Sequence, residues 1–286
     1  MRICWFDDNR LGLVRDSQIH DVTGVLGELS LTFPYPQGDP LIANLGRLRP
    51  AMERFADKAE GRALSDVKLL SPVANPSKIM GTPANYRKHI AEAHGDPGAF
   101  DMSKFSGSVI EQGLFLKASS SLVGPSQGVA VRFPDRRTDH ECELGVIIGK
   151  TAAGIDEKKA LDYVAGYAIA LDMTVRGSED RSFRKSVESY AVLGPWMVTA
   201  DEIADPDALD FELSVGDEVR QKSNTSQMIL SVAEQIAWAS RFYTLHPGDI
   251  IMTGTCEGVA PVKPGDVMRC AFEGIGEMVV PVRAAD

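Results

Sequence analysis

The sequence predicts an α+β fold, in which a small N-terminal α+β domain precedes a β-rich domain. Three observations support this prediction. Residues 247–249 and 264–266 both read Pro-Gly-Asp, and each precedes an apolar run, as expected for turns that lead into strands. Residues 42–55 instead carry apolar side chains at intervals of three and four, which is the helical period. The proline-punctuated residues 70–76 separate the two patterns.

The N-terminal region is expected to begin with a short apolar segment, followed by a turn at residues 7–10 and a strand at 11–14. The helix over residues 42–55 comes next. Pro50 should bend or interrupt it, because proline lacks the backbone N–H and its ring clashes with the preceding turn. We place the boundary after this helix, which gives predicted domains of residues 1–72 and 73–286.

The second domain is expected to be mostly strand, with a few helices. Asn224 is a predicted helix N-cap, and Gln227 completes a pattern like a capping box. The apolar residues that would then share one face of this helix, and pack on a sheet, are Met228, Val232, Ile236 and Ala239. The strands are expected to form a mixed β-sandwich, a roll or a barrel.

Composition limits the partners and the compartment. Apolar residues make up 44% of the chain and charged residues 24%, as in soluble globular proteins. A net charge of -10 argues against nucleic acid or an anionic membrane as the main partner. The four cysteines form no Cys-x-x-Cys pair, which indicates a reducing setting. Because no apolar run approaches membrane-spanning length and the N-terminus is acidic, we expect a cytoplasmic protein.

Three carboxylates suggest a metal centre. Glu141 and Glu143 lie just before an apolar run, and side chains two apart in a strand share a face. Asp172 interrupts a second apolar run. Burying like charges requires a compensating cation, and an oxygen-only ligand set favours Mg²⁺, Mn²⁺ or Ca²⁺ over zinc. In the alternative, both glutamates lie on a solvated edge, paired with Arg136 or Arg137.

Basic residues cluster after Asp172 in a chain that is acidic overall; they are Arg176, Arg181, Arg184 and Lys185. Together with a metal they could neutralise a carboxylate or keto acid, and the lysine could polarise a carbonyl. An equally good alternative is a solvated loop in which these bases pair with neighbouring acids.

His89 and Glu92 form a second candidate site. If residues 85–92 are helical, the two side chains share a face, and the carboxylate can orient the imidazole as a general base for water. An incidental surface pair is the commoner outcome at this spacing. The adjoining residues 95–100 are rich in glycine and proline and would suit a mobile lid that carries the pair over a site.

The loop at residues 253–258 could hold a ligand oxygen through its amides and the Thr255 hydroxyl, although a plain hairpin connection is the alternative. Cys256 has no histidine or asparagine partner apparent in the sequence, so an unreactive thiol is expected.

Taken in order, these segments resemble the fumarylacetoacetate hydrolase family over roughly residues 77–282. No single segment is decisive, but the ordered series is strong. The matching positions are Tyr86 with His89 and Glu92, 115–117, Glu141 with Glu143, 165–167, Asp172 with Arg176, Lys185 with Ser186, 193–196, Gln221 with 223–225, 247–249, 253–255 and 274–276.

The resemblance implies a β-rich catalytic domain, usually in a homodimer, that binds Mg²⁺ or Mn²⁺ through Glu141, Glu143 and Asp172. It implies a hydrolase that cleaves a carbon-carbon bond in diketo acids such as acylpyruvates, fumarylpyruvate or fumarylacetoacetate, in aromatic or small-acid catabolism. The residues expected to act in catalysis are His89, Glu92 and Lys185. Those expected to contact the small anionic oxo acid are Tyr86, Arg176, Glu179 and Thr255.

The sequence also departs from the family pattern. Leu171 stands where the family often has asparagine, and Glu179 where some members have glutamine. Three further positions differ from the usual residue: Glu188 replaces aspartate, Cys256 replaces proline and Ala260 replaces glycine. An extra carboxylate at Glu179, near the pocket, would disfavour a second anionic group there.

Two alternative functions stay open at this point. An isomerase of 2-hydroxyhepta-2,4-diene-1,7-dioate type, or a decarboxylase of oxaloacetate type, would use the same metal without attacking water. A metal- and ligand-binding protein without catalysis is the third possibility, and the His-Glu pair and Lys185 argue against it.

Overall fold

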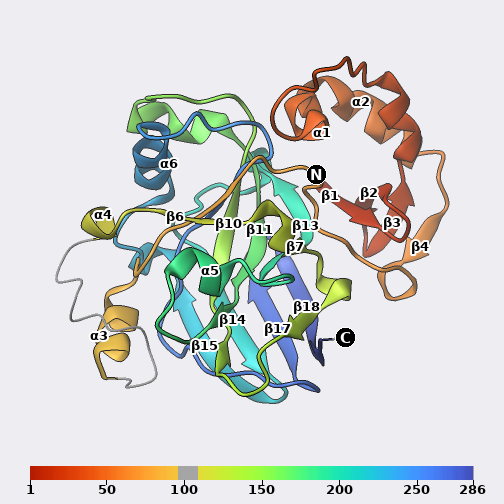
Figure 1. The fold of residues 1–286 in the computed structure, drawn as a ribbon. Coiled ribbons are helices and arrows are strands. Elements are labelled where there is room, and N and C mark those ends of the chain that lie inside the picture. Colours follow the sequence, from red (N-terminus) through yellow and green to blue (C-terminus); the bar gives the residue numbers. More distant parts are fainter. Residues whose placement is uncertain (96–108, 286) are drawn as a thin grey trace.

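The computed structural model describes residues 1–95 and 109–285. Most of its strands belong to two large sheets, with short helices around them (Figure 1). This mixed, sheet-rich architecture confirms the predicted α+β class. Both large sheets are open, so the expectation of a barrel is wrong for the described residues: the outermost strands of each sheet do not pair with each other.

The larger sheet has 11 strands in the order β4-β3-β2-β1-β13-β11-β10-β16-β5-β6, and β7 also pairs with β13. Its strands are β1 (Arg2–Phe6), β2 (Arg10–Arg15), β3 (Gln18–Asp21), β4 (Gly61–Ala63), β5 (Ile79–Gly81), β6 (Phe115–Lys117), β7 (Leu122–Val123), β10 (Cys142–Ile148), β11 (Val164–Asp172), β13 (Ala191–Thr199) and β16 (Ile250–Met252). Strands β10, β11 and β13 form its centre. They are buried almost throughout, because both faces of the sheet are covered there.

The smaller sheet has the order β15-β14-β17-β18-β8. Its strands are β8 (Val129–Val131), β14 (Asp210–Val215), β15 (Glu218–Asn224), β17 (Val267–Phe272) and β18 (Gly276–Ala284). In β18 buried and exposed residues alternate, so one face packs on the core and the other meets solvent. A further pair, β9 (Thr138–Asp139) with β12 (Thr174–Val175), lies next to the carboxylates.

The N-terminal strands continue the larger sheet, since β1 pairs antiparallel with β13 through Arg2 and Val198. An apolar core joins the two regions as well: Leu48 and Met52 of the N-terminal region belong to the same cluster as Leu193 of β13. The division at residue 72 stays a prediction, and the two regions share backbone pairing across it.

The helix expected over residues 42–55 is two helices, α1 (Pro40–Ala43) and α2 (Leu45–Ala56), which meet at Asn44. The expectation that Pro50 interrupts the helix is wrong, because Pro50 lies inside α2. A proline removes a single helical hydrogen bond, and α2 buries an apolar face that compensates for the loss. The buried residues of that face are Leu48, Ala51, Met52 and Ala56.

The remaining helices are short: α3 (Arg87–Gly95), α4 (Val109–Gln112), α5 (Arg181–Lys185) and α6 (Val232–Ser240). Helix α6 begins later than predicted. Ser231 caps it and forms a capping box with Glu234, whereas Asn224 caps the preceding 3-10 turn, Thr225–Gln227. Helix α6 packs against the 3-10 helix Glu157–Tyr163.

Both Pro-Gly-Asp turns are confirmed. Gly248 and Gly265 have φ values of 85° and 97°, which suit the third position of a type II turn, and β16 and β17 follow directly. Within residues 1–95 and 109–285, no helix is long and apolar enough to cross a membrane.

Candidate metal centre and active site

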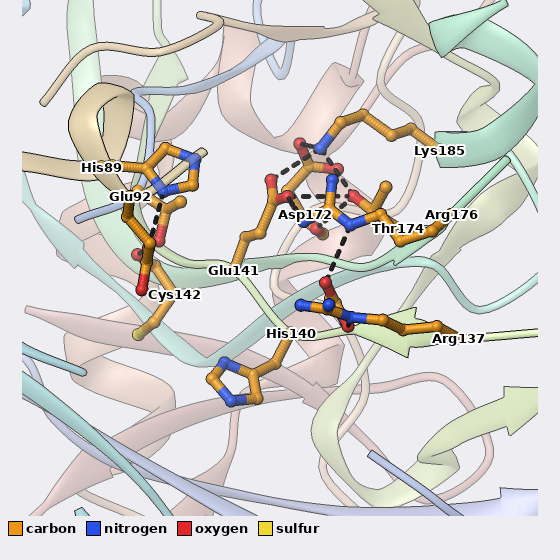
Figure 2. Close-up of polar contacts among 12 residues, drawn as sticks. His89, Glu92, Arg137, His140, Glu141, Cys142, Asp172, Thr174, Arg176 and Lys185 are labelled. Atoms are coloured by element: carbon orange, nitrogen blue, oxygen red, sulfur yellow. Dashed lines mark hydrogen bonds and ion pairs between the residues drawn. The ribbon is translucent and has the colours of Figure 1, made fainter. Parts of the chain in front are cut away.

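The three predicted carboxylates meet where β10 and β11 lie side by side. Cys142 pairs with Leu171, and the backbone N–H of Asp172 donates to the carbonyl of Glu141 at 2.9 Å. As a result Glu141, Glu143 and Asp172 each offer an oxygen within 4.8 Å of the others. Figure 2 shows two of them, Glu141 and Asp172, pointing toward Lys185. All three side chains are buried, so the expectation of a solvated edge for the glutamates is wrong.

The donor set fits a hard divalent cation. Glu143 accepts a hydrogen bond from the N–H of Gly254 at 2.8 Å, yet its burial, and next the charges of Asp172 and Glu141, raise its pKa well above the usual range. A divalent ion would compensate this crowding of like charges. Three carboxylate oxygens, without a cysteine or histidine among them, suit Mg²⁺, Mn²⁺ or Ca²⁺ better than zinc.

Lys185 reaches into the carboxylate group from α5. Its Nζ lies 2.6 Å from Glu141 Oε2, 2.6 Å from Asp172 Oδ2 and 2.7 Å from Thr174 Oγ1. Burial alone would raise the pKa of Glu141, but the positive charges of Lys185 and Arg176 outweigh it and hold that pKa far below its ordinary value. The carboxylate of Glu141 is therefore ionised and available as a ligand.

Lys117 also contacts this carboxylate group, although the sequence placed it only within the matching segment 115–117 and gave it no role. Its side chain is fully buried, and Nζ donates to Asp172 Oδ1 and, at 2.9 Å, to the carbonyl of Tyr190. It comes from the short strand β6, where the sequence carries only a single lysine after two apolar residues. Asp172 thus contacts two ammonium groups, one on each carboxylate oxygen.

Arg176 lies beside the centre, as predicted, and Asp139 holds it there. The buried Asp139 accepts from Arg176 Nε at 2.8 Å and from Arg137 Nε at 2.7 Å. Arg176 Nη2 is also 3.2 Å from Glu141 Oε1. Asp139 was missed, although its position two residues before Glu141, the spacing of one strand face, was a usable signal.

His89 and Glu92 share a face of α3, as the sequence predicted. His89 Nδ1 and Glu92 Oε2 are 3.3 Å apart (Figure 2). Glu92 Oε1 accepts from the N–H of Gly258 at 2.9 Å. Burial pushes the pKa of Glu92 upward, but the hydrogen bonds from His89 and Gly258 outweigh it and leave the pKa below its usual value. The proposed lid at residues 95–100 lies, except for Gly95, outside the described residues.

One open pocket connects these groups. Its lining includes these predicted site residues: His89, Glu92, Glu141, Glu143, Asp172, Arg176, Lys185 and Thr255. Its lining also includes Gln112, Phe115, Arg137, Arg181 and Arg184. The pocket therefore places the carboxylates, the cations and the His-Glu pair around one space.

Two residues expected to contact substrate are not among the described residues that line this pocket. Tyr86 is buried in the core, edge-on to Phe211 with their ring centroids 6.2 Å apart. Glu179 points to solvent and bonds both Nη atoms of Arg136, at 2.9 and 2.8 Å. The expectation that Glu179 opposes a second anionic group in the pocket thereby loses its basis.

Thr255 lines the pocket, but its hydroxyl is already engaged. It donates to the carbonyl of Cys142 at 2.9 Å and accepts from Gln221 Nε2 at 2.7 Å. Gln221 Oε1 in turn accepts from the Cys142 N–H at 3.0 Å and lies 3.0 Å from His140 Nδ1, which fixes the orientation of the amide. The Thr255 hydroxyl can therefore accept a further hydrogen bond, but it cannot donate one to a ligand.

Cys256 next to it is buried, and that burial, followed by the charge of Glu257, raises the pKa of its thiol to about 12. An unreactive thiol, as predicted, follows from this pKa because the thiolate is the nucleophilic form.

Gln221→Leu is expected to destabilise the protein by about 2 kcal/mol or more, because it leaves the buried Cys142 N–H and the buried His140 Nδ1 without their partner. Urea unfolding measures this change, with Gln227→Leu on the exposed 3-10 turn as the matched control. Equal midpoints for the two variants would contradict the role assigned to Gln221.

The chain is similar to known proteins over its full length. Residues 78–283 match the family model described as fumarylacetoacetate (FAA) hydrolase C-terminal. A maleylpyruvate hydrolase of Aquipseudomonas alcaligenes is 51% identical over 99% of this chain and 100% of its own length.

Solved structures give the same family. Maleylpyruvate hydrolase from Sphingobium sp. SYK-6, in complex with manganese(II) and pyruvate, is 39% identical with a TM-score of 0.83, and the match covers 100% of both chains. A probable 2-hydroxyhepta-2,4-diene-1,7-dioate isomerase from Mycobacterium abscessus is 27% identical with a TM-score of 0.77, covering 100% of this chain and 98% of its own. The predicted resemblance is confirmed: the chain belongs to the fumarylacetoacetate hydrolase family.

Proposed function

We propose that the protein is a divalent-metal-dependent hydrolase that cleaves a carbon-carbon bond in acylpyruvates of the maleylpyruvate class. The observation that carries the proposal is a single pocket that joins the buried carboxylates to Lys185 and to the His89–Glu92 pair. The similarity to maleylpyruvate hydrolases over the full chain supports the substrate class. Pyruvate, held by the Sphingobium enzyme, is also the fragment that hydrolysis of any acylpyruvate releases.

Glu141, Glu143 and Asp172 would hold the divalent ion, which would bind the oxygens of the 2-oxo acid and draw electron density from its carbonyl. The three N–H groups of Lys185 now bond Glu141, Asp172 and Thr174. With the charge of these two carboxylates offset, Lys185 would be able to donate to a substrate oxygen instead.

His89 acts as the general base for water, and Glu92 orients its ring. The oxygen of the water adds to the acyl carbonyl carbon, while His89 takes the proton. Lys185 donates to the oxyanion that forms. The bond between this carbon and the neighbouring CH₂ then breaks, and its electron pair stays with the pyruvate fragment, which takes up a proton. The products are one carboxylate from the acyl group and one pyruvate.

Several finer points belong to the same proposal. The Sphingobium complex makes Mn²⁺ the first ion to test, with Mg²⁺ second and Ca²⁺ third. The family resemblance supports a homodimer and a role in aromatic catabolism. Four unpaired cysteines accord with the reducing cytoplasm, and the acidic net charge favours neither nucleic acid nor an anionic membrane as a partner.

Product identification tests the proposal. The protein is stripped with a chelator, reloaded with Mn²⁺ or Mg²⁺, and supplied with maleylpyruvate and other acylpyruvates. We expect stoichiometric pyruvate and maleate, which appear only after metal is restored. An absence of turnover on every acylpyruvate would refute the proposal.

Isomerisation of a 2-hydroxydienoate diacid is the second candidate, because isomerases are among the similar solved structures. It needs no attack by water, so the orientation of His89 by Glu92 favours hydrolysis over it. The two reactions are separated by their products, since isomerisation yields one organic product and hydrolysis yields two.

A further inference from the structure

We propose that Arg181 binds the second carboxylate of a dianionic substrate, so that the enzyme prefers acylpyruvates whose acyl group itself ends in a carboxylate. The inference rests on the proposed function, and it assigns a specificity role to a residue outside the metal centre. It also reverses the expectation that Glu179 would keep a second anion away.

Arg181 and Lys185 occupy one face of α5. They are four residues apart, so their side chains lie side by side, about 6 Å apart at the Cβ atoms. Lys185 turns to the carboxylates of the metal centre. Both cations also lie over the ring of Phe115, with Arg181 Cζ 5.4 Å and Lys185 Nζ 5.1 Å from its centroid. Phe115 thus links the metal end of the pocket to the Arg181 end.

Gln112 of α4 contacts the guanidinium of Arg181. Arg181 Nη2 donates to Gln112 Oε1 at 3.3 Å, and both residues line the pocket. Because glutamine is neutral, the contact with Gln112 orients the guanidinium and itself offsets none of its charge. A guanidinium has five N–H donors in a planar fork that matches a carboxylate, and the Gln112 amide adds two more.

The charges around the pocket favour a second anion. Its described lining has five basic side chains, Arg137, Arg176, Arg181, Arg184 and Lys185, against four acids. Three of those acids are the proposed metal ligands, whose charge a divalent ion largely offsets. The described lining, with a divalent ion bound, is therefore positive inside a protein with a net charge of -10. A substrate with two carboxylates complements it better than one with a single carboxylate.

Electrostatic repulsion among the arginines of the pocket also favours binding of a second anionic group there. Burial lowers the pKa of Arg184, and the neighbouring positive charges of Arg176 and Arg181 lower it further. An anionic group bound between α5 and α4 would relieve this repulsion. Glu179 does not do so from inside the pocket, because its carboxylate is held outside by Arg136.

Arg181→Gln tests the assignment with two substrates of the Mn²⁺-loaded enzyme. We expect kcat/KM for maleylpyruvate, a dianion, to fall by about 10- to 100-fold, the loss typical of a hydrogen bond between charged groups. The value for acetylpyruvate, a monoanion, should change by less than about 3-fold. Arg181→Lys should retain part of the preference, because it keeps the charge and loses the fork. Arg132→Gln, which removes an exposed arginine that pairs with Glu188, is the matched control.

Calorimetric titration with maleate alone gives a readout independent of turnover. Weaker maleate binding in Arg181→Gln than in the wild type and Arg132→Gln supports the inference. Unchanged maleate binding, or equal losses for both substrates in a variant that melts like the wild type, overturns it. A wild type that binds maleate through Arg181 but turns over neither substrate would refute the proposed function and leave the anion site standing.

Discussion

Glu143→Gln is expected to weaken Mn²⁺ binding and lower turnover by more than about 100-fold, and yet to raise the melting temperature of the metal-free protein. The loss of Mn²⁺ affinity should exceed the 10- to 100-fold loss that is typical when a residue that supports a metal ligand is replaced. The stabilisation follows from the raised pKa of Glu143, which means that the folded protein prefers the neutral carboxyl. Glutamine is neutral at every pH and nearly isosteric, so it removes the repulsion from Asp172 and Glu141.

Thermal melts with and without Mn²⁺ measure both effects on one sample. The metal-free variant should melt about 2 °C or more above the wild type, and added Mn²⁺ should stabilise it far less. Glu60→Gln, an exposed substitution of the same chemistry, should change neither value. A metal-free Glu143→Gln protein that melts below the wild type would show that Glu143 has a structural role and is no strained metal ligand.

The cluster of Glu141, Glu143 and Asp172 could be predicted because most of its arrangement follows from local backbone geometry. Side chains two apart on a strand share a face, so Glu141 and Glu143 needed only the assumption of a strand. Asp172 depended on the register that pairs Cys142 with Leu171, which no local pattern specifies. Asp172 was included because it is an acid that interrupts a second apolar run, and the structure brings it to the other two.

Lys117 and Asp139 were missed because their partners are far away in sequence. Lys117 is 55 residues from Asp172, and Asp139 is 37 from Arg176. Both lie in strands of two or three residues, too short for a periodic signal. Glu179 was placed near the pocket because some members of the family have a glutamine at this position, but in this chain an ion pair with Arg136 holds it in solvent.

The predicted helix boundaries were wrong where burial in the tertiary structure outweighs the local preferences of proline and of capping residues. Pro50 lies within α2 because the buried face of that helix compensates for one missing hydrogen bond. Asn224 is a good cap by composition, yet it serves a single 3-10 turn, and the stronger Ser231–Glu234 box begins α6. The β-rich class was predictable because the two Pro-Gly-Asp turns determine local backbone geometry, whereas closure into a barrel depends on which distant strands pair.

His89→Ala is the second change with a large expected effect. It should lower kcat for acylpyruvate hydrolysis by about 100- to 10,000-fold, the usual contribution of a general base, with Mn²⁺ affinity nearly unchanged. Metal binding should persist because His89 is not among the three clustered carboxylates. Stopped assays of pyruvate release and Mn²⁺ titrations measure the two quantities, and His20→Ala, whose Nδ1 contacts the carbonyl of Ala59 in the N-terminal region, is the control.

Glu92→Gln and the double variant separate a catalytic pair from two independent residues. If Glu92 acts only by orienting His89, then His89→Ala combined with Glu92→Gln should be no slower than His89→Ala alone, because effects of groups that act as a unit are not additive. Additive losses would assign Glu92 a role of its own, for which its bond to the N–H of Gly258 is the structural candidate. If His89→Ala instead kept full hydrolytic activity, another group would have to activate the water. The His89–Glu92 pair would then no longer favour hydrolysis over isomerisation.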